Sequence, residues 1–297
     1  MHDYVVRGLA AQGKILAMGA RTTNLVEEAR QRHGTYPTAT AALGRALTAV
    51  ALLGQTLKAK ETITLRVEGG GPIGWIIADA DSEGHVRGYV KNPQIDLPAT
   101  PQGKLAVGAA VGKEGHLYIT RDPGLKEPYT GSAQLVSGEI AEDLAHYFAY
   151  SEQTPTAVAL GVKVDKEGGV LAAGGFLLQF LPGGQDEELA RDLEGRLAQL
   201  KGVTQLLEEG LTPEEILQEI LGSWGVQILE RRPVDFRCRC SREKAAASLL
   251  TLPQEELEEM AAGKGGQVRC HFCNTLYEFS PEEVRALLTP AAAEERP

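Results

Sequence analysis

Hydrophobic and polar positions alternate along much of the first two-thirds of the chain. Between Tyr4 and Met18 the apolar side chains predict one or two strands around a turn at Gly13. Further short apolar or alternating runs are bounded by glycine or proline, which end strands. They predict strands at residues 62–68, 75–78, 86–90, 105–111, 117–120, 133–136, 157–164 and 170–180.

A period of 3.6 residues predicts helices among these strands. Thr23 is expected to cap the first helix, and Ser137 is expected to cap one that runs to Tyr150. The helix after Pro37 is rich in alanine and leucine on most of its sides, so it should be buried. Together these elements predict an α+β core domain over residues 1–182, with antiparallel sheets and helices.

Residues 183–232 change character, because three short amphipathic helices are predicted in succession. Asp186 begins the first of these helices, and Thr212–Glu215 forms a capping box at the start of the third. Short helices are marginal in water, so each must pack its leucines against a neighbouring surface. We expect a helical linker that lies on the first domain at rest. If a neighbouring domain melts, the linker should loosen and expose its aliphatic side chains.

Residues 233–297 predict a small C-terminal domain. Ser241 is expected to cap a helix, Tyr277–Phe279 to form a short strand, and Ser280–Glu283 to form a second capping box. Few of these residues can form a core, so a bound metal must supply much of the stability. The tail from Pro290 is expected to fray.

The candidate chemistry lies in this domain, which holds the only four cysteines of the chain. They form a C-x-C pair and a C-x-x-C pair about thirty residues apart, at Cys238, Cys240, Cys270 and Cys273. Two sulfurs from each pair can close on one tetrahedral ion, and thiolate ligands favour zinc. His271 lies between the last two cysteines, but four sulfurs already complete the site. We therefore predict one Zn²⁺ per chain.

The residues alone leave two interpretations of this zinc site. It is either a purely structural staple or a site whose thiolates react with an oxidant and release the metal. Oxidised locally, each pair can form its own disulfide, and bonds in such small rings are strained and readily reduced. Losing a structural zinc removes about 10–16 kcal/mol of apparent binding energy, against about 5 kcal/mol of reserve stability. The zinc domain should therefore unfold when it is oxidised.

The composition narrows the function classes. The 297 residues carry a formal net charge of −10 and only 5% aromatic side chains, which disfavours a nucleic-acid or anionic-membrane surface. No run of about eighteen residues is apolar throughout, and the N-terminus shows no hydrophobic signal segment. Thiols without an export signal indicate a reducing compartment, so we expect a cytoplasmic protein.

Several motifs in the core domain match catalytic or cofactor sites only in spacing. Gly69, Gly71 and Gly74 have the spacing of a dinucleotide fingerprint, but a strand is predicted after them where that site requires a helix. Residues 79–84 fit a hairpin turn better than a calcium loop. The six histidines are scattered, and no nucleophile elbow, P-loop or helix-borne zinc-protease motif is present. We expect no enzymatic activity.

The cysteine spacing combines with sequence blocks elsewhere to give a specific pattern. The set consists of Gly71–Gly74, Val86–Pro93, Ser137–Leu144, Cys238–Ser241, and Cys270–Cys273 with Tyr277 and Phe279. Over nearly its whole length the chain resembles the heat-shock protein 33 family, the bacterial redox-regulated holdase chaperones.

The resemblance implies a core domain, a helical linker that senses unfolding and a C-terminal zinc switch. In such proteins the reduced, zinc-bound form is inactive, and oxidation forms two disulfides, releases zinc and unfolds the linker. Here these disulfides map to Cys238 with Cys240 and Cys270 with Cys273. The active form, generally a homodimer, holds unfolding client proteins against aggregation without ATP. The resemblance thus implies a chaperone of the oxidative stress response.

Two other function classes fit parts of the sequence. A constitutive zinc-ribbon adaptor or nucleic-acid-binding module would need a basic face near the metal, yet the same domain carries Glu255, Glu256, Glu258 and Glu259. A thiol–disulfide oxidoreductase shares the C-x-x-C motif, but no βαβ unit precedes Cys270. The chaperone is therefore the predicted function.

Overall fold

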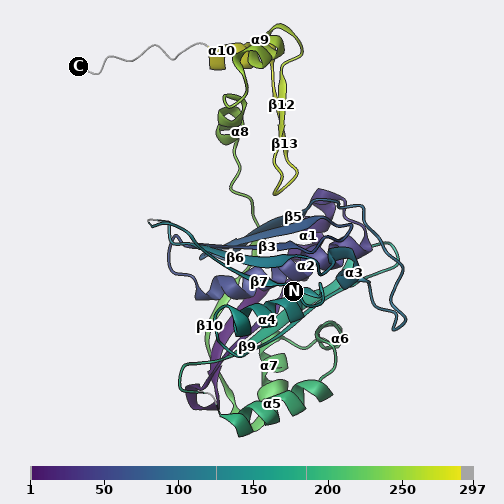
Figure 1. The fold of residues 1–297 in the computed structure, drawn as a ribbon, viewed down its shortest axis with the longest axis vertical. Coiled ribbons are helices and arrows are strands. Elements are labelled where there is room, and N and C mark those ends of the chain that lie inside the picture. The colour runs from purple at the N-terminus through teal and green to yellow at the C-terminus, as the bar shows by residue number, and fades with distance from the viewer. Residues whose placement is uncertain (1, 125, 185, 289–297) are drawn as a thin grey trace, which may run out of the picture. The chain divides into compact units, whose positions relative to one another are not determined.

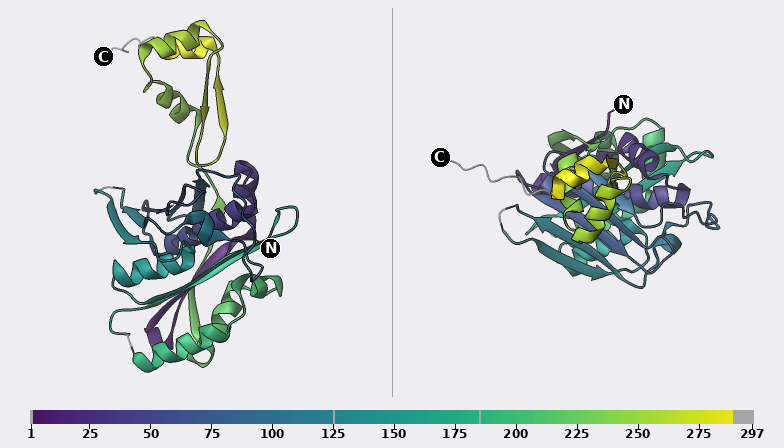
Figure 2. Two further views of the ribbon diagram at one scale, coloured as in Figure 1. Left: turned by 45° about the vertical axis from the view of Figure 1, so that its right-hand side comes forward. Right: turned by 90° about the horizontal axis from the view of Figure 1, so that it is seen from above.

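The chain forms two units in a computed structural model, which describes residues 2–124, 126–184 and 186–288 (Figures 1 and 2). The first unit is Met1–Arg237 and the second is Cys238–Pro297. The first unit contains two mainly antiparallel sheets with helices between and beside them, and the second is a small α+β module. The predicted α+β fold class is confirmed.

The first sheet is antiparallel throughout and has the strand order β10-β1-β2-β9-β8. A short 3₁₀ turn at Ala11–Gly13 joins β1 to β2, at the place where the sequence predicts a turn. β9 is buried along most of its length, since helices cover both faces of the sheet, and its sequence is accordingly almost continuously apolar. The strands span Tyr4–Ala10 (β1), Ile15–Arg21 (β2), Thr156–Val164 (β8), Val170–Phe180 (β9) and Val226–Pro233 (β10).

The second sheet has the order β11-β5-β4-β3-β6-β7. β11 pairs with β5 in parallel, and the other neighbours are antiparallel. Positions along β3 alternate between buried and more exposed, which is typical of a sheet with one face on the core. The strands span Thr62–Glu68 (β3), Trp75–Asp81 (β4), His85–Val90 (β5), His116–Asp122 (β6), Tyr129–Gln134 (β7) and Asp235–Phe236 (β11).

Helices α1, α2 and α4 lie between the two sheets (Figure 1). α2 (Pro37–Leu53) contacts β4 of one sheet and β9 of the other, and fifteen of its seventeen residues are buried. This confirms the prediction that it is a core helix. α1 spans Thr23–His33 and ends at Gly34, whose φ of 61° glycine adopts without strain. α4 spans Ile140–Tyr150.

Three helices of the predicted linker, α5, α6 and α7, cover the opposite face of the first sheet. Their leucine and isoleucine side chains form a second hydrophobic cluster with Val6 and Phe176 of that sheet. The linker therefore lies on the core domain, as predicted. The helices span Glu187–Gln199 (α5), Val203–Glu208 (α6) and Pro213–Leu221 (α7), and a 3₁₀ turn at Gly222–Trp224 follows.

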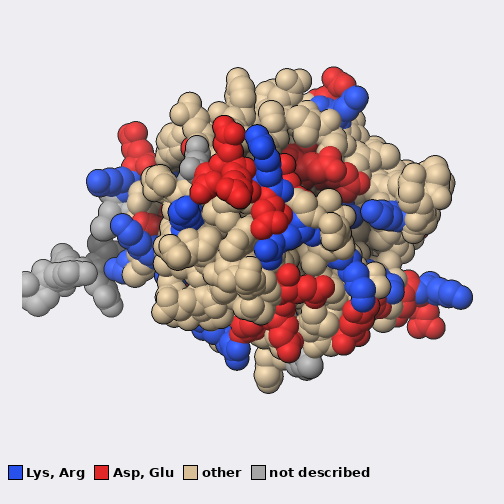
Figure 3. All heavy atoms as spheres, turned by 90° about the horizontal axis from the view of Figure 1, so that it is seen from below, with Lys and Arg blue, Asp and Glu red and all other residues tan. Residues whose placement is uncertain are grey.

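The predicted starts of two linker helices are confirmed. Asp186 Oδ1 accepts hydrogen bonds from two backbone N–H groups in the first turn of α5. Thr212 and Glu215 make a reciprocal capping box at the start of α7. Seen from the side on which α5 and α7 lie, acidic and basic side chains are interspersed on the surface (Figure 3).

The second unit consists, up to residue 288, of α8, α9, a hairpin of β12 and β13, and α10. Ser241 Oγ accepts a hydrogen bond from the N–H of Lys244, and Ser280–Glu283 forms the second predicted capping box. Its buried core is small and comprises Ala245, Leu249, Leu257, Ala261, Phe279 and Val284, together with Cys273. The elements span Arg242–Leu249 (α8), Gln254–Ala262 (α9), Gly266–Arg269 (β12), Leu276–Phe279 (β13) and Pro281–Leu288 (α10).

The strand predicted at residues 105–111 is wrong. Val107–Val111 forms a short helix, α3, and Val107, Ala110 and Val111 are its buried residues. These positions are i, i+3 and i+4, a helical spacing that a short apolar run also satisfies. The run is too short for its period to distinguish the two structures. β7 also lies earlier than predicted, since it ends at Gln134.

The end of the linker forms a strand that the sequence analysis did not predict. β10 pairs with β1 in antiparallel register, with Tyr4 opposite Pro233. Val226 and Ile228 alternate with more exposed residues, which is a strand signal, but the run follows three helices and its partner is distant in the sequence. β11 then joins the second sheet beside β5. The segment predicted as a helical linker thus also supplies an edge strand.

Two predicted helix caps are wrong. Thr23 is the first residue of α1, and its Oγ1 donates to the carbonyl oxygen of Ala173 at 3.4 Å. Asp3 Oδ2 instead accepts a hydrogen bond from Leu25 N at 2.7 Å in the first turn. α4 begins three residues after Ser137, so Ser137 does not cap it. The group that replaces Thr23 comes from a segment outside the helix, which local sequence does not reveal.

The boundaries predicted for the core domain (1–182), the linker (183–232) and the zinc domain (233–297) remain predictions. The linker packs into the first unit, which runs to Arg237. The boundary between core domain and linker must therefore be defined by which segments unfold together. The prediction for the tail from Pro290 lies outside the described residues.

Candidate metal centre

The four cysteines lie on two segments of the second unit. Cys238 and Cys240 belong to the extended stretch before α8, while Cys270 follows β12 and Cys273 precedes β13. The turn of the second pair is closed by hydrogen bonds from Cys270 N to Thr275 O (3.0 Å) and from Asn274 N to Cys270 O (2.8 Å). Asn274 has a φ of 60°, which asparagine tolerates better than most residues. The hairpin thereby directs both sulfurs of this pair to one side.

The structure brings all four predicted sulfurs together. Cys238 Sγ lies 3.7 Å from Cys270 Sγ, Cys240 Sγ lies 3.4 Å from Cys273 Sγ, and the four sulfurs lie within 4.8 Å of one another. Tetrahedral zinc with Zn–S bonds of about 2.3 Å separates its sulfurs by about 3.8 Å. Bonded disulfide sulfurs would be about 2.05 Å apart, and none of the four cysteines forms a disulfide. The donor set therefore fits one tetrahedral zinc ion.

The cluster is unique within the described part of the chain. No other group of three or more His, Cys, Asp or Glu side chains there is placed to hold a metal, and His271 is not a member of the cluster. Cys273 is buried, whereas the other three cysteines are half-buried.

Hydroxyl groups contact two of the sulfurs. The Tyr277 hydroxyl donates a hydrogen bond to Cys240 Sγ at 3.1 Å, and Thr275 Oγ1 lies 3.2 Å from Cys273 Sγ. Sequence reasoning missed both contacts, because they depend on how the β12–β13 hairpin faces the first cysteine pair. Such contacts orient metal ligands and adjust their charge.

The thiols do not share one tendency to ionise. Burial raises the pKa of Cys240 and of Cys270 above the ordinary value. For Cys273, burial is the largest single influence and would raise the pKa. Hydrogen bonds with Thr275 and with the neighbouring thiols together outweigh burial, so the pKa of Cys273 is lowered. Four thiolates packed this closely repel one another, so the fully ionised cluster requires a compensating cation.

The glycine segment and the acidic turn of the core domain are structural. β4 follows Gly69–Gly74 directly, as predicted, and a Cβ on Gly69 would lie 2.3 Å from the carbonyl oxygen of Gly112. These glycines allow two backbones to approach closely. In the turn between β4 and β5, Asp81 Oδ1 accepts hydrogen bonds from the backbone N–H groups of Glu83 and His85. This confirms the hairpin turn.

Comparison with known proteins places this architecture in a family. A family profile described as Hsp33 protein matches residues 3–280. The chain belongs to the Hsp33 family. It is 51% identical over 289 residues to the 33 kDa chaperonin of Desulforamulus reducens, which covers 97% of this chain and 98% of the relative. It is 54% identical over 286 residues to the 33 kDa chaperonin of Symbiobacterium thermophilum, with 96% of each chain covered.

A solved Hsp33 structure has the same fold. The crystal structure of the 33 kDa chaperonin, or heat shock protein 33 homolog, from Thermotoga maritima matches with a TM-score of 0.91 and 42% sequence identity. The match covers 97% of this chain and 98% of the other. The resemblance to the heat-shock protein 33 family is thus confirmed by sequence and by structure.

Membership of the Hsp33 family sets the coarse function. The family consists of non-enzymatic chaperones, so this chain is a chaperone, and the prediction that it is not an enzyme is confirmed. A chaperone acts on unfolded client proteins. The family favours this function over the zinc-ribbon adaptor and the thiol–disulfide oxidoreductase. Within the described residues, the longest apolar helices are too short or too polar to cross a bilayer.

Proposed function

We propose that this chain is a redox-regulated, ATP-independent holdase. Its reduced, zinc-bound form is inactive, and its oxidised form protects unfolding or oxidatively damaged proteins from aggregation. The observation that carries the proposal is the cluster of four sulfurs within 4.8 Å of one another, not joined by disulfides, in a unit whose core is small. Such a unit depends on its metal for stability.

Cys238, Cys240, Cys270 and Cys273 would hold the ion in the reduced form, one Zn²⁺ per chain. When bound, Zn²⁺ would neutralise the cluster and keep all four sulfurs as thiolates. The thiolate is the nucleophilic form of cysteine, and three of the four side chains are half-exposed. These sulfurs therefore combine reactivity toward peroxide or hypochlorous acid with access.

Each disulfide forms in two steps that balance with one peroxide. A thiolate attacks a peroxide oxygen, the O–O bond breaks, and a sulfenic acid forms with loss of hydroxide. The second thiol of the pair then displaces the sulfenic oxygen as water and the S–S bond forms. Two electrons pass from two sulfurs to one peroxide, whose oxygens leave as one hydroxide and one water, and the hydroxide takes a proton from the solvent. Disulfide sulfurs are poor ligands, so the oxidised cysteines no longer hold Zn²⁺.

We propose disulfides between Cys238 and Cys240 and between Cys270 and Cys273. The folded cluster also brings Cys238 near Cys270 and Cys240 near Cys273, so its geometry does not select the pairing. Once the unit unfolds, cysteines that are neighbours in the sequence stay close, whereas distant ones separate. Peptide mapping of the oxidised protein by mass spectrometry tests this pairing, and a Cys240–Cys273 peptide would contradict it.

Unfolding of the second unit is proposed to reach the linker through the chain itself. Only Arg237 separates β11 from Cys238, and β10 and α7 precede β11. The linker helices bury leucine and isoleucine side chains against the first sheet. Their release would expose a contiguous aliphatic surface, which is the kind of surface that binds unfolded proteins.

The remaining features of the proposal follow the family. The active form is proposed to be a homodimer, and the protein is proposed to work in the cytoplasm during oxidative stress, where reductants restore its thiols. Neither a nucleic acid nor a membrane is proposed as a partner, because the net charge of −10 repels polyanions.

The test follows metal release and chaperone action in parallel. Zinc-loaded, reduced protein is treated with peroxide at raised temperature, and zinc release is measured with a chromophoric chelator. Light scattering of a thermally denaturing client protein reports aggregation in the same samples. We expect released zinc and suppressed scattering to rise together, and reduced protein to leave scattering unchanged. If zinc leaves and the client still aggregates, the holdase proposal is wrong.

A further inference from the structure

The second unit contains a thioether as well as its four thiols. The chain has three methionines, Met1, Met18 and Met260, and Met260 is the one that belongs to the second unit. It lies in the last turn of α9, is half-buried, and packs against the small hydrophobic cluster of that unit. The second unit thus holds two kinds of oxidisable sulfur.

The sulfur of Met260 lies where α8 contacts β12. A methyl group on Gly266 would lie 3.3 Å from Met260 Sδ and 3.6 Å from a methyl carbon of Leu249, and Gly266 and Leu249 are both buried. The carbonyl oxygen of Met260 accepts a hydrogen bond from Gly265 N at 3.0 Å, so the backbone of α9 also joins the start of β12. Met260 therefore packs at the first residue of β12, while Cys270 follows the other end of that strand (Figure 1).

An oxygen atom on this sulfur would not fit the cluster. A methionine sulfoxide is polar, and it disrupts apolar packing. If the side chain stayed in place, the oxygen would lie unpaired against the methyl groups of Leu249. If the side chain turned toward solvent instead, it would leave an empty space in the cluster. Either outcome destabilises a unit that buries few other side chains.

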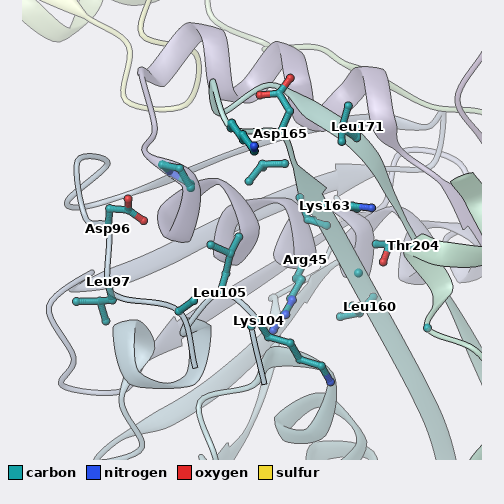
Figure 4. Close-up of a pocket in the computed structure, with 18 of the residues that line it drawn as sticks. Arg45, Asp96, Leu97, Lys104, Leu105, Leu160, Lys163, Asp165, Leu171 and Thr204 are labelled. Atoms are coloured by element: carbon teal, nitrogen blue, oxygen red, sulfur yellow. The ribbon is translucent and has the colours of Figure 1, made fainter. Parts of the chain in front are cut away.

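The first unit offers an oxidant no comparable sulfur among its described residues. Met18 is 1% exposed and belongs to the large core cluster. The groove beside β8 has a volume of about 1000 Å³ and is lined by charged and aliphatic side chains such as Lys104, Leu105 and Leu160 (Figure 4). None of its described lining residues is a cysteine or a methionine. Within the described chain, the partly exposed sulfur therefore lies in the second unit.

We propose that Met260 is a second oxidation site of the second unit, and that its sulfoxide delays the return of the chaperone to its inactive form. The proposal rests on the redox-regulated holdase function and deepens it. Thiol reductants restore the cysteines, whereas methionine sulfoxide is reduced by a separate class of enzyme, the methionine sulfoxide reductases. After thiol reduction alone, the unit must refold around zinc with a polar group in its cluster.

The oxidant for this site is hypochlorous acid. Peroxide reacts quickly with a thiolate but slowly with a neutral thioether, whereas hypochlorous acid reacts quickly with both. The Met260 sulfur attacks the chlorine, the Cl–O bond breaks and hydroxide leaves. Water then replaces chloride on the sulfur and gives up its two protons, one of them to the hydroxide. Two electrons pass from sulfur to chlorine, and the net products are the sulfoxide, chloride and one proton.

The effect on zinc follows from the link between folding and metal binding. Met260 is half-buried in the folded unit and becomes fully accessible once cysteine oxidation has unfolded it. When folding and metal binding are coupled, a less stable unit binds its metal more weakly by the same factor. The reduced protein that carries the sulfoxide should therefore bind zinc about tenfold more weakly than the unmodified protein.

The test compares two oxidants on full-length, zinc-loaded protein. Samples treated with hypochlorous acid or with peroxide are reduced with a thiol, desalted and given zinc. Peptide mass spectrometry detects oxygen added at Met260, and a competing chromophoric chelator measures zinc affinity. We expect the sulfoxide and an about tenfold loss of zinc affinity after hypochlorous acid, and neither after peroxide. Full zinc affinity in protein that carries the sulfoxide would overturn the proposal, and so would absence of the sulfoxide after hypochlorous acid.

Two substitutions separate Met260 from the other oxidised groups. Met260→Leu keeps an apolar side chain of similar volume and should regain full zinc affinity after either oxidant. Met18→Leu is the matched control in the first unit and should behave like the parent. A methionine sulfoxide reductase should restore the zinc affinity of the treated parent, which separates the sulfoxide from irreversibly oxidised cysteine. An equal loss of affinity in Met260→Leu and Met18→Leu would refute the site.

Met260→Gln tests the effect of polarity without any oxidant. Glutamine places a polar group of similar length at the same position, so this reduced variant should bind zinc about tenfold more weakly than Met260→Leu. Equal zinc affinities of the two variants would contradict the effect proposed for the sulfoxide.

Failure of this site and failure of the holdase function give different results. Light scattering of a denaturing client is measured directly after hypochlorous acid treatment, and again after thiol reduction and zinc addition. We expect the parent and Met260→Leu to suppress scattering equally at first, and the parent alone to keep part of this suppression after reduction. Equal loss of suppression in both would remove Met260 from the regulation and leave the holdase function intact. No suppression by either protein directly after oxidation would instead contradict the holdase function.

Discussion

A single carboxylate joins the first helix of the core to the sheet below it. Glu27 in α1 accepts two hydrogen bonds from the guanidinium of Arg30, at 2.8 and 2.7 Å, and one from Val170 N of β9 at 3.0 Å. The hydrogen bonds from Arg30 are the main cause that lowers the pKa of Glu27 to about 2. A carboxyl group with a lowered pKa stabilises the fold above its unfolded value of 4.5 and loses that effect as pH falls toward 2.

We therefore predict that Glu27→Gln lowers the free energy of unfolding by about 2 kcal/mol at neutral pH. The gap between parent and variant should narrow below pH 4.5 and close near pH 2, because protonation removes the same charge from the parent. Denaturant midpoints measured from neutral to acidic pH check this. Glu28→Gln is the control, since Glu28 pairs with Arg32 on the exposed side of the same helix and should change stability by less than about 0.5 kcal/mol.

At the metal centre, the residue to test is Tyr277. Its hydroxyl donates to Cys240 Sγ at 3.1 Å, and this contact is the main cause that raises the pKa of Tyr277 to about 12. The hydroxyl therefore stays protonated and remains a donor at neutral pH. We predict that Tyr277→Phe keeps the fold and lowers zinc affinity about tenfold, a typical loss when a metal ligand loses its hydrogen-bond partner.

Competition with a chromophoric chelator measures that zinc affinity, and circular dichroism checks the fold. Tyr150→Phe is the control, because Tyr150 is 72% exposed in the first unit. An affinity equal to that of the parent would show that the Tyr277 hydroxyl does not support the sulfur.

At the scale of elements, the sequence predicted those helices and strands whose pattern is long and local. The seventeen-residue α2 is apolar on most of its sides, and four adjacent residues form the capping box of α7. The strand prediction at α3 was wrong because a run of five residues satisfies both the helical period and the strand period. β10 was missed because its partner, β1, lies at the other end of the chain. Local patterns therefore predict an element, whereas pairing between distant segments decides the ambiguous ones.

At the metal centre, too, local sequence patterns were predictive and contacts between distant segments were not. Cysteine spacing alone predicted which four side chains form the cluster, because their type and pairing are local. The hydroxyls of Tyr277 and Thr275 could not be predicted, since their contacts arise when the β12–β13 hairpin faces the segment before α8. The sequence therefore predicts which side chains are the metal ligands. The hydroxyl groups that contact those ligands can be identified only from the fold.

The linker helix α7 offers a prediction at this scale. Thr212 Oγ1 accepts a hydrogen bond from Glu215 N, and Glu215 Oε2 accepts one from Thr212 N at 2.8 Å. Thr212→Ala removes one half of this capping box and should destabilise the helix by about 1 kcal/mol. A short helix depends on such terms, so the linker should open more often and be cut faster by protease, and client binding should begin at a lower peroxide dose.

Ser280→Ala is the matched control for Thr212→Ala. Ser280 forms the equivalent capping box with Glu283 at the start of α10, in the second unit. It should leave protease cleavage within residues 187–221 unchanged in the reduced protein. If Thr212→Ala and Ser280→Ala show the same linker cleavage as the parent, the caps do not control linker release.

At the scale of the whole molecule, the two units differ in what stabilises them. The first unit has two extended hydrophobic clusters on the two faces of the first sheet. The second unit buries a handful of side chains, two of them alanine, near the cysteine cluster. Since burial contributes about 25 cal/mol per Å² of apolar surface, we expect the first unit to be stable without a metal and the second to need one.

Removal of the metal without oxidation should therefore unfold one unit and leave the other. We predict that a strong chelator, added under reductant, abolishes hydrogen-exchange protection of the amides in β12 and β13 while those in α2 stay protected. Added zinc should restore β12 and β13, because the thiols remain reduced and able to bind. Glu27→Gln serves as an internal comparison, since it weakens the first unit and should leave zinc-dependent protection of β12 unchanged. Retained protection of β12 and β13 in the metal-free, reduced protein would show that packing alone holds the second unit, and the metal could then not act as its switch.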